Sequence, residues 1–222
     1  MHREGFGEND FVHVFSRGVE KRLIFLDDHD RWRFLALLIL LQGDVVLPQI
    51  GRLVKDVKHL VFDKEPFLKI ADKKYIELVS FCLMPNHFHL ILHEISEGGI
   101  SRYMQRLLNA YAKYFNTRHK RSGHLFSGPF RAIRVDNDEY LDYLSAYIHL
   151  NPKELNGWRN REVEYFWSSF QDLVDGNRWA QFLYTDIITD KFKNGKEYYD
   201  FVIETPIKEI KNELEEELLI DD

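Results

Sequence analysis

Apolar and polar positions recur with regular periods along the first half of the chain, and these periods predict its elements. Residues 11–18 have strand composition and end in a glycine turn. Residues 27–42 open with acids suited to a helix N-terminus and continue with good helix formers. Two apolar runs, 74–84 and 87–94, are separated by a Pro-Asn turn signal. We therefore expect a strand, a helix and a β-hairpin, in this order.

The second half of the chain continues with two helices around one further strand. Residues 98–119 place apolar side chains at three-and-four spacing and basic residues on the other side. Residues 129–135 are strand-like, and residues 136–151 begin with acids and stop at Pro152, as a helix does. A last helix is expected within 206–219.

The predicted order is strand, helix, strand, strand, helix, strand, helix, which favours an α+β fold. Its natural packing is an antiparallel sheet with helices on one face, as in a ferredoxin-like or RNA-recognition fold. Residues 42–75 are irregular, with a short helix expected near 50–62, and form a variable insertion.

The composition is that of a globular protein. A chain of 222 residues with 45% hydrophobic side chains can bury the core of one domain plus an appendage. Its apolar stretches are too short for a membrane span, and its start lacks the layout of a signal peptide. Cys82 is the single cysteine, which excludes an internal disulfide. We expect a cytoplasmic protein with no membrane partner.

The formal net charge of −6 conceals two segments of opposite sign. Residues 100–135 contain no Asp or Glu, whereas residues 204–222 are strongly acidic. The acidic tail either occupies the basic region as a mimic of DNA or only keeps the protein soluble. The basic segment attracts phosphates, unless it is merely a solvated helix face. Its charged side chains are Arg102, Arg106, Lys113, Arg118, Lys120, Arg121, Arg131 and Arg134, with the rings of Tyr114 and Phe126 available for stacking on unpaired bases.

The hairpin contains the first candidate for chemistry, the histidines of "SFCLMPNHFHLILHE". His87 and His89 are two residues apart on a predicted strand, so their side chains share one face. Two neighbouring imidazoles can bind one divalent cation. The alternative is that they are ordinary half-exposed polar residues of a one-sided sheet.

The helix that ends in "YIHLN" supplies the second candidate. Tyr147 and Asn151 are four residues apart, which places the phenol and the amide one turn apart on one helix face. An amide oxygen beside two imidazoles gives a site suited to Mg²⁺ or Mn²⁺. A tyrosine next to such a metal can form a covalent intermediate with a phosphate, although Tyr147 could also be one more core aromatic. We expect His149, between the two, to point elsewhere, and Tyr111 to belong to the core.

Several motifs together resemble the single-tyrosine HUH transposases, the IS200-like family, and most closely the REP-associated tyrosine transposases. They are "FVHVFSRGVEKRLIFLDDHDRWRFL", "MPNHFHLIL", "GGISRYMQRLLNAYAKYFNTRH", "GHLFSGPFRAI", "YLDYLSAYIHLNP" and "EYFWSSF", which cover most of residues 11–172. The resemblance implies an HUH catalytic domain at 1–155 and a C-terminal extension with an acidic helical tail at 156–222.

The resemblance also implies a mechanism. His87, His89 and Asn151 would hold the metal, and Tyr147 would attack the phosphorus of single-stranded DNA, forming a 5′-phosphotyrosine and freeing a 3′-hydroxyl that can later rejoin strands. The target would contain a hairpin or palindromic repeat, and the protein would be a nucleoid-associated enzyme, acting alone or as a homodimer. A catalytically silent DNA-binding regulator and an RNA-binding module are the alternatives, although "HFHLILHE" lacks the aromatic, glycine-rich strand signature of the latter.

Overall fold

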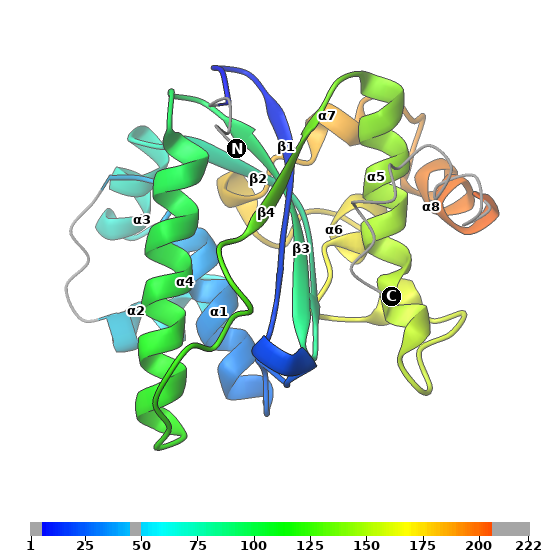
Figure 1. Ribbon diagram of the computed structural model, residues 1–222. Coiled ribbons are helices and arrows are strands. Elements are labelled where there is room, and N and C mark those ends of the chain that lie inside the picture. The colour runs from blue at the N-terminus through cyan, green and yellow to red at the C-terminus, as the bar shows by residue number, and fades with distance from the viewer. Residues whose placement is uncertain (1–5, 45–49, 206–222) are drawn as a thin grey trace.

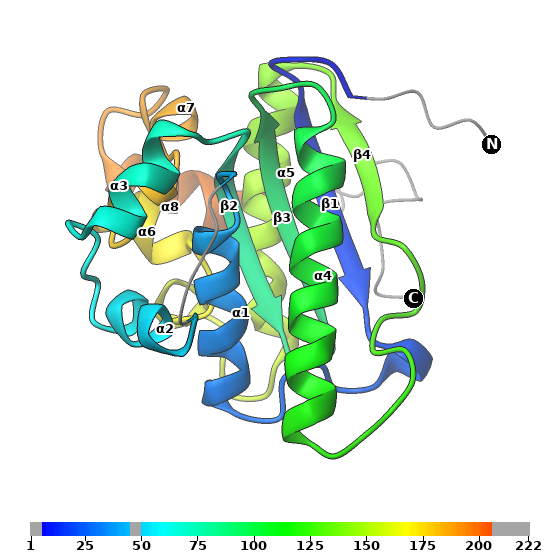
Figure 2. The same cartoon turned by 90° about the vertical axis from the view of Figure 1, so that its left-hand side faces the viewer.

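The computed structural model describes residues 6–44 and 50–205, and this part of the chain forms one sheet between two layers of helices (Figure 1; Figure 2). The strands are β1 Phe11–Arg17, β2 Ile76–Met84, β3 His87–Glu94 and β4 Arg131–Val135. The α-helices are α1 Asp28–Leu40, α2 Ile50–Lys58, α3 Glu65–Asp72, α4 Gly99–Arg118, α5 Asp138–Leu150, α6 Phe170–Val174, α7 Asp186–Thr189 and α8 Gly195–Glu204.

The sheet has the strand order β2-β3-β1-β4, and each neighbouring pair is antiparallel. With α1 between β1 and β2 and α4 between β3 and β4, this is the βαββαβ arrangement of a ferredoxin-like fold. The predicted α+β class, antiparallel sheet and hairpin are therefore confirmed.

Helices α1 and α5 begin where the sequence supplies a capping side chain. Asp27 accepts a hydrogen bond from the backbone N–H of Asp30 at 3.1 Å, which fixes the start of α1. Asn137 does the same for the N–H of Tyr140 at 2.8 Å and starts α5. As predicted, α5 ends just before Pro152, where the chain tightens into a short 3₁₀ helix.

The expectation that helices cover one face of the sheet is wrong, because both faces are covered (Figure 1). Helices α1 and α4 pack against one face, over a core that includes Phe88, Leu90 and Leu92 of β3. Helix α5 packs against the other face, over a second core that includes Phe15 and Ile91, and side chains of α6 and α8 complete this core behind α5. Both sets of side chains are fully buried, so β3 has no solvent-facing side.

The chain beyond residue 155 packs against the edge of the sheet and the back of α5. The N–H of Leu83 donates to the carbonyl of Trp167 at 2.8 Å, and the N–H of Ser169 donates to the carbonyl of Phe81 at 2.9 Å. Side chains of α6 and α8 belong to the same core as α5. The described part of the C-terminal extension thus holds the helix that carries Tyr147.

The variable insertion contains the two helices α2 and α3 in its described part, where one short helix was expected. The last helix predicted, within 206–219, lies outside the described residues. Across the described part of the chain, every helix is too short or too polar to cross a membrane.

Candidate metal and nucleophile site

His87 and His89 share the face of β3 that α5 covers, as the alternation of the strand predicts. The exposed fraction is 3% for His87 and 0% for His89, and the ring centroids are 5.2 Å apart. The alternative of two half-exposed polar residues on a one-sided sheet is therefore wrong. Buried imidazoles need partners, so the contacts of each ring nitrogen decide what they can do.

Asn86 determines which nitrogen of His87 carries the proton. The amide nitrogen of Asn86 donates to the carbonyl of Lys21 at 3.3 Å, so its Oδ1 is turned toward His87. That oxygen lies 2.7 Å from Nδ1 of His87 and can only accept, so Nδ1 is the protonated nitrogen. When the ring is neutral, Nε2 of His87 then carries a lone pair, and a ring nitrogen with a lone pair can bind a metal.

Asn151 turns its own oxygen toward that lone pair. Its amide nitrogen caps the last turn of α5 by donating to the carbonyl of Tyr147 at 2.9 Å. Its Oδ1 lies 3.5 Å from Nε2 of His87. With His87 neutral and its proton on Nδ1, Nε2 and this oxygen would both be acceptors, and a cation between them would satisfy both. With Nε2 protonated, the two atoms form a hydrogen bond.

His13 on β1 is the site residue that sequence reasoning missed. Its Nε2 lies 3.0 Å from Nδ1 of His89, and both rings are fully buried. Burial lowers the pKa of His13 to about 3 and, with the neighbouring His87, holds the pKa of His89 well below its usual value, so both rings are neutral. The Nε2 of His89 has no hydrogen-bond partner in the described part of the protein.

Tyr147 lies edge-on against these rings. The centroid of its ring is 5.5 Å from that of His89 and 6.5 Å from that of His13, with interplanar angles of 88° and 84°. Its exposed fraction is 6%, and that of Asn151 is 4%. The sequence-predicted set of His87, His89, Tyr147 and Asn151 is thus brought together between β3 and α5 of one chain.

The donor set at this place could hold a divalent cation. It offers Nε2 of His87, the partnerless Nε2 of His89 and the oxygen of Asn151, with no thiolate among them. In the described residues, no three His, Cys, Asp or Glu side chains are grouped so that they could hold an ion. A metal here therefore needs the amide oxygen of Asn151.

His149 and Tyr111 behave as predicted. His149 makes two hydrogen bonds in a separate buried network. Its Nδ1 lies 2.7 Å from the hydroxyl of Tyr198, and its Nε2 lies 2.8 Å from the hydroxyl of Ser169. Burial lowers the pKa of His149 to about 3. Tyr111 is buried and donates to the carbonyl of Ile24 at 2.6 Å. Neither residue faces the metal and nucleophile site.

The predicted DNA-binding side chains fall into two groups. Several have partners in the fold: Arg102 pairs with Asp44, Arg106 with Gly43 and Tyr75, Arg118 with Asp27 and Asp30, Arg121 with Asn116 and His124, Arg134 with Asp10, and the Tyr114 hydroxyl with His29. Lys113, Lys120 and Arg131 are exposed, with no ion pair or side-chain hydrogen bond in the described part of the chain.

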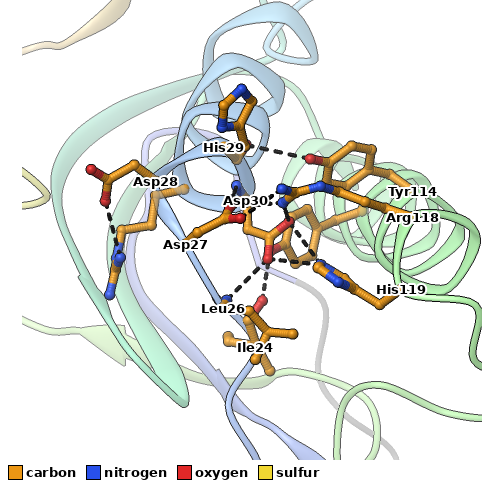
Figure 3. Close-up of polar contacts among 11 residues, drawn as sticks. Ile24, Leu26, Asp27, Asp28, His29, Asp30, Tyr114, Arg118 and His119 are labelled. Atoms are coloured by element: carbon orange, nitrogen blue, oxygen red, sulfur yellow. Dashed lines mark hydrogen bonds and ion pairs between the residues drawn. The ribbon is translucent and has the colours of Figure 1, made fainter.

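The pairing of Arg118 joins the end of α4 to the start of α1 (Figure 3). Arg118 donates to both oxygens of Asp27, at 2.7 and 2.6 Å, and to Oδ1 of Asp30 at 2.5 Å. Asp30 is fully buried and also contacts His119 at 3.0 Å. The hydrogen bond from Arg118 holds the pKa of Asp27 well below its usual range. The segment without acids along the sequence is therefore partly neutralised by acids from other elements.

The fold and this site together define a class: an α+β protein with a ferredoxin-like sheet whose buried strand histidines face a tyrosine and an asparagine on a covering helix. Residues 53–151 match the family model described as transposase IS200 like, and this segment includes all four predicted site residues. Over this segment the chain is similar to the IS200-like transposases.

No curated protein matches the chain. The chain is similar to a solved structure of a REP-associated tyrosine transposase bound to a REP hairpin, with 14% sequence identity and a TM-score of 0.49, over 84% of this chain and 92% of that one.

Proposed function

We propose that the protein cuts and rejoins single-stranded, hairpin-containing DNA, with Tyr147 as the nucleophile and a divalent metal held by His87, His89 and Asn151. One observation carries the proposal. Nε2 of His87 lies 3.5 Å from the Asn151 oxygen, while the ring of Tyr147 lies edge-on against that of His89. The proposed cation site and the proposed nucleophile, Tyr147, therefore lie side by side.

The metal would be Mg²⁺ or Mn²⁺. When bound, it would polarise a non-bridging oxygen of the scissile phosphate and stabilise the charge that builds there. Asn86 and His13 are the outer partners of the two histidines, since each contacts the Nδ1 atom and leaves Nε2 to face the site.

The chemical step is one substitution at phosphorus. The Tyr147 oxygen loses its proton and forms a bond to the phosphorus, while the bond from phosphorus to the 3′-oxygen breaks. The leaving oxygen takes up a proton and becomes a free 3′-hydroxyl, and the 5′-phosphate remains on the tyrosine. Attack by a 3′-hydroxyl on this phosphotyrosine reverses the step and joins strands, so no nucleotide cofactor is needed.

The substrate follows from charge and from the resemblance. Lys113, Lys120 and Arg131 are exposed basic groups that suit a phosphate backbone. The hairpin form of the target rests on the likeness of the motifs to those of REP-associated tyrosine transposases. The contact of Tyr147 with His89 of the same chain supports a site that one chain completes by itself, so a homodimer is not required for it.

An adduct assay tests the proposal. The full chain is incubated with Mn²⁺ and a pool of DNA hairpins that carry random single-stranded flanks, labelled at either end. We expect protein linked to the 3′-labelled fragments, release of the 5′-labelled ones, and loss of both with a chelator. Tyr147→Phe should form no adduct, whereas Tyr143→Phe on the same helix should react like the unaltered protein. An adduct that persists in Tyr147→Phe, or that retains the 5′ label, would contradict the proposal.

A DNA-binding regulator without cleavage is the second candidate, and one observation favours it. His87, His89, Tyr147 and Asn151 are all 6% exposed or less, so a phosphate must gain access before it can react. Hairpin binding by the intact protein without any adduct, together with binding that survives His87→Ala, would support this candidate. An RNA-recognition module is disfavoured, because α5 covers the sheet face on which such modules stack bases.

A further inference from the structure

A groove lies between α4 and the segment 123–130 that leads into β4. It holds about 600 Å³ of space and is lined mainly by apolar atoms. Leu108 and Ala112 of α4 form one wall, and Phe126 and Phe130 contribute aromatic rings from the other. The groove is on the α4 side of the sheet, so it is separate from the metal and nucleophile site.

The rim of the groove carries hydrogen-bonding groups that the fold does not use. Gln105 and Asn109 are four residues apart on α4, line the groove and are exposed. Their amides have no hydrogen-bond partner within the part of the chain that the structure describes, and the ring of the exposed His124 is likewise unpaired there. An apolar slot with unused donors and acceptors at its edge suits a flat, polar-edged ligand.

The charge around the groove specifies the ligand further. Lys113 follows Asn109 by one helical turn and Arg131 follows Phe130, and both are exposed without a partner among the described residues. None of the described residues that line the groove is acidic. We propose that the groove binds one unpaired nucleobase of the DNA substrate, with its ring against the apolar walls, its edge at Gln105 and Asn109, and its phosphates near Lys113 and Arg131.

The backbone connects this groove to the reactive end of the sheet. The N–H of Ser127 donates to the carbonyl of Arg17 at 2.9 Å, and the N–H of Val19 donates to the carbonyl of Leu125 at 3.0 Å. Arg17 pairs with His87 in the register of β1 and β3. A base held in the groove would therefore fix the position of the strand relative to the metal and nucleophile site, which deepens the proposed function and rests on it.

The experiment combines a blocked groove with missing bases. Hairpins recovered from the adduct pool are remade with one abasic position at a time, and binding to the full chain is measured by fluorescence anisotropy. We expect one unpaired position at which base removal weakens binding about tenfold. Ala112→Leu fills the groove without changing charge, so it should weaken binding to the intact hairpin about tenfold and abolish the effect of that abasic position.

Two variants keep the result interpretable. Thr117→Leu adds the same kind of side chain at an exposed place on α4 outside the groove and should bind like the unaltered protein. Asn109→Ala, which removes an amide without adding bulk, should weaken binding at the same position. Normal binding by Ala112→Leu, or an abasic effect that persists in it, would overturn the groove proposal alone. Failure of the unaltered protein to bind any hairpin would overturn the proposed function as well.

Discussion

Nε2 of His13 lies 3.0 Å from Nδ1 of His89, between two fully buried rings that are both neutral. One proton must lie between these nitrogens, and either ring can supply it. If His13 donates, Nδ1 of His89 is the acceptor, so the one N–H proton of the neutral His89 ring is on Nε2, where it blocks a metal. If His89 donates, its Nε2 is a lone pair. A cation at His89 would select the second state, in which His13 serves as the acceptor.

The first prediction concerns this acceptor. His13→Phe keeps a ring in the core but removes the nitrogen that accepts from His89, so we expect Mn²⁺ affinity to fall by about tenfold to a hundredfold. Calorimetric titration of the protein with Mn²⁺ measures this without any DNA. His13→Gln can still place an acceptor near His89 and should recover part of the loss. Equal Mn²⁺ affinity in His13→Phe and the unaltered protein would show that His13 is only a core residue.

The second prediction concerns the oxygen that faces His87. Asn151→Leu removes this oxygen, so we expect a loss of Mn²⁺ affinity of at least about tenfold. Asn151→Asp retains an oxygen and adds a negative charge, so it should bind Mn²⁺ at least as tightly as the unaltered protein. The same titration compares the two variants, and thermal unfolding in a chelator shows whether each is folded. Unchanged affinity in Asn151→Leu would remove this residue from the metal site.

The third prediction separates the two groups of basic residues. Lys113→Ala and Arg131→Ala should each weaken binding to single-stranded DNA and reduce the slope of log affinity against log salt by about 0.7. Arg118→Ala should instead lower the free energy of unfolding by on the order of 2–4 kcal/mol, since it leaves the buried carboxylate of Asp30 with fewer donors. Anisotropy over a range of salt and urea unfolding measure the two effects. A full salt-slope change in Arg118→Ala with unchanged stability would contradict this division.

The elements that the sequence predicted well are those whose signals are local. The hairpin corner, the caps of α1 and α5 and the stop at Pro152 all depend on residues within a few positions of one another. The layer arrangement is not local, because an apolar helix face does not say which side of a sheet it covers. The apolar runs at 81–84 and 90–92 were the available signal, since a strand buried on both faces has apolar residues at successive positions.

The same distinction applies to the site. His87 with His89, and Tyr147 with Asn151, are set by the periods of one strand and one helix, and spacing was enough to group each pair. His13 joins them through the pairing of β1 with β3, across a separation of 76 residues that no local pattern encodes. The acidic partners of Arg118 are 88 and 91 residues away in the sequence. A segment without acidic residues can therefore still have basic side chains that form ion pairs.

The fourth prediction concerns stability at low pH and uses His149, which lies on α5 with its side chain away from the metal and nucleophile site. Its pKa is lowered to about 3 in the fold by burial, against 6.5 for an ordinary histidine, so between these values the unfolded chain binds one more proton at this position. The free energy of unfolding should therefore fall as the pH falls from about 6.5 toward 3, by up to about 1.4 kcal/mol per pH unit for this group.

His149→Gln removes that contribution. The test compares the slope of the free energy of unfolding against pH, so a change in stability at neutral pH does not affect it. Urea unfolding between pH 6 and about pH 4, with a chelator present, should show a shallower pH dependence in His149→Gln than in the unaltered protein. His29→Gln, at an exposed position of α1, should leave the slope unchanged. Carboxylates titrate in the same range in all three proteins, so only the difference between them reports on the buried ring. If the free energy of unfolding had the same pH dependence in His149→Gln and in the unaltered protein, protonation of His149 would not contribute to the loss of stability in acid.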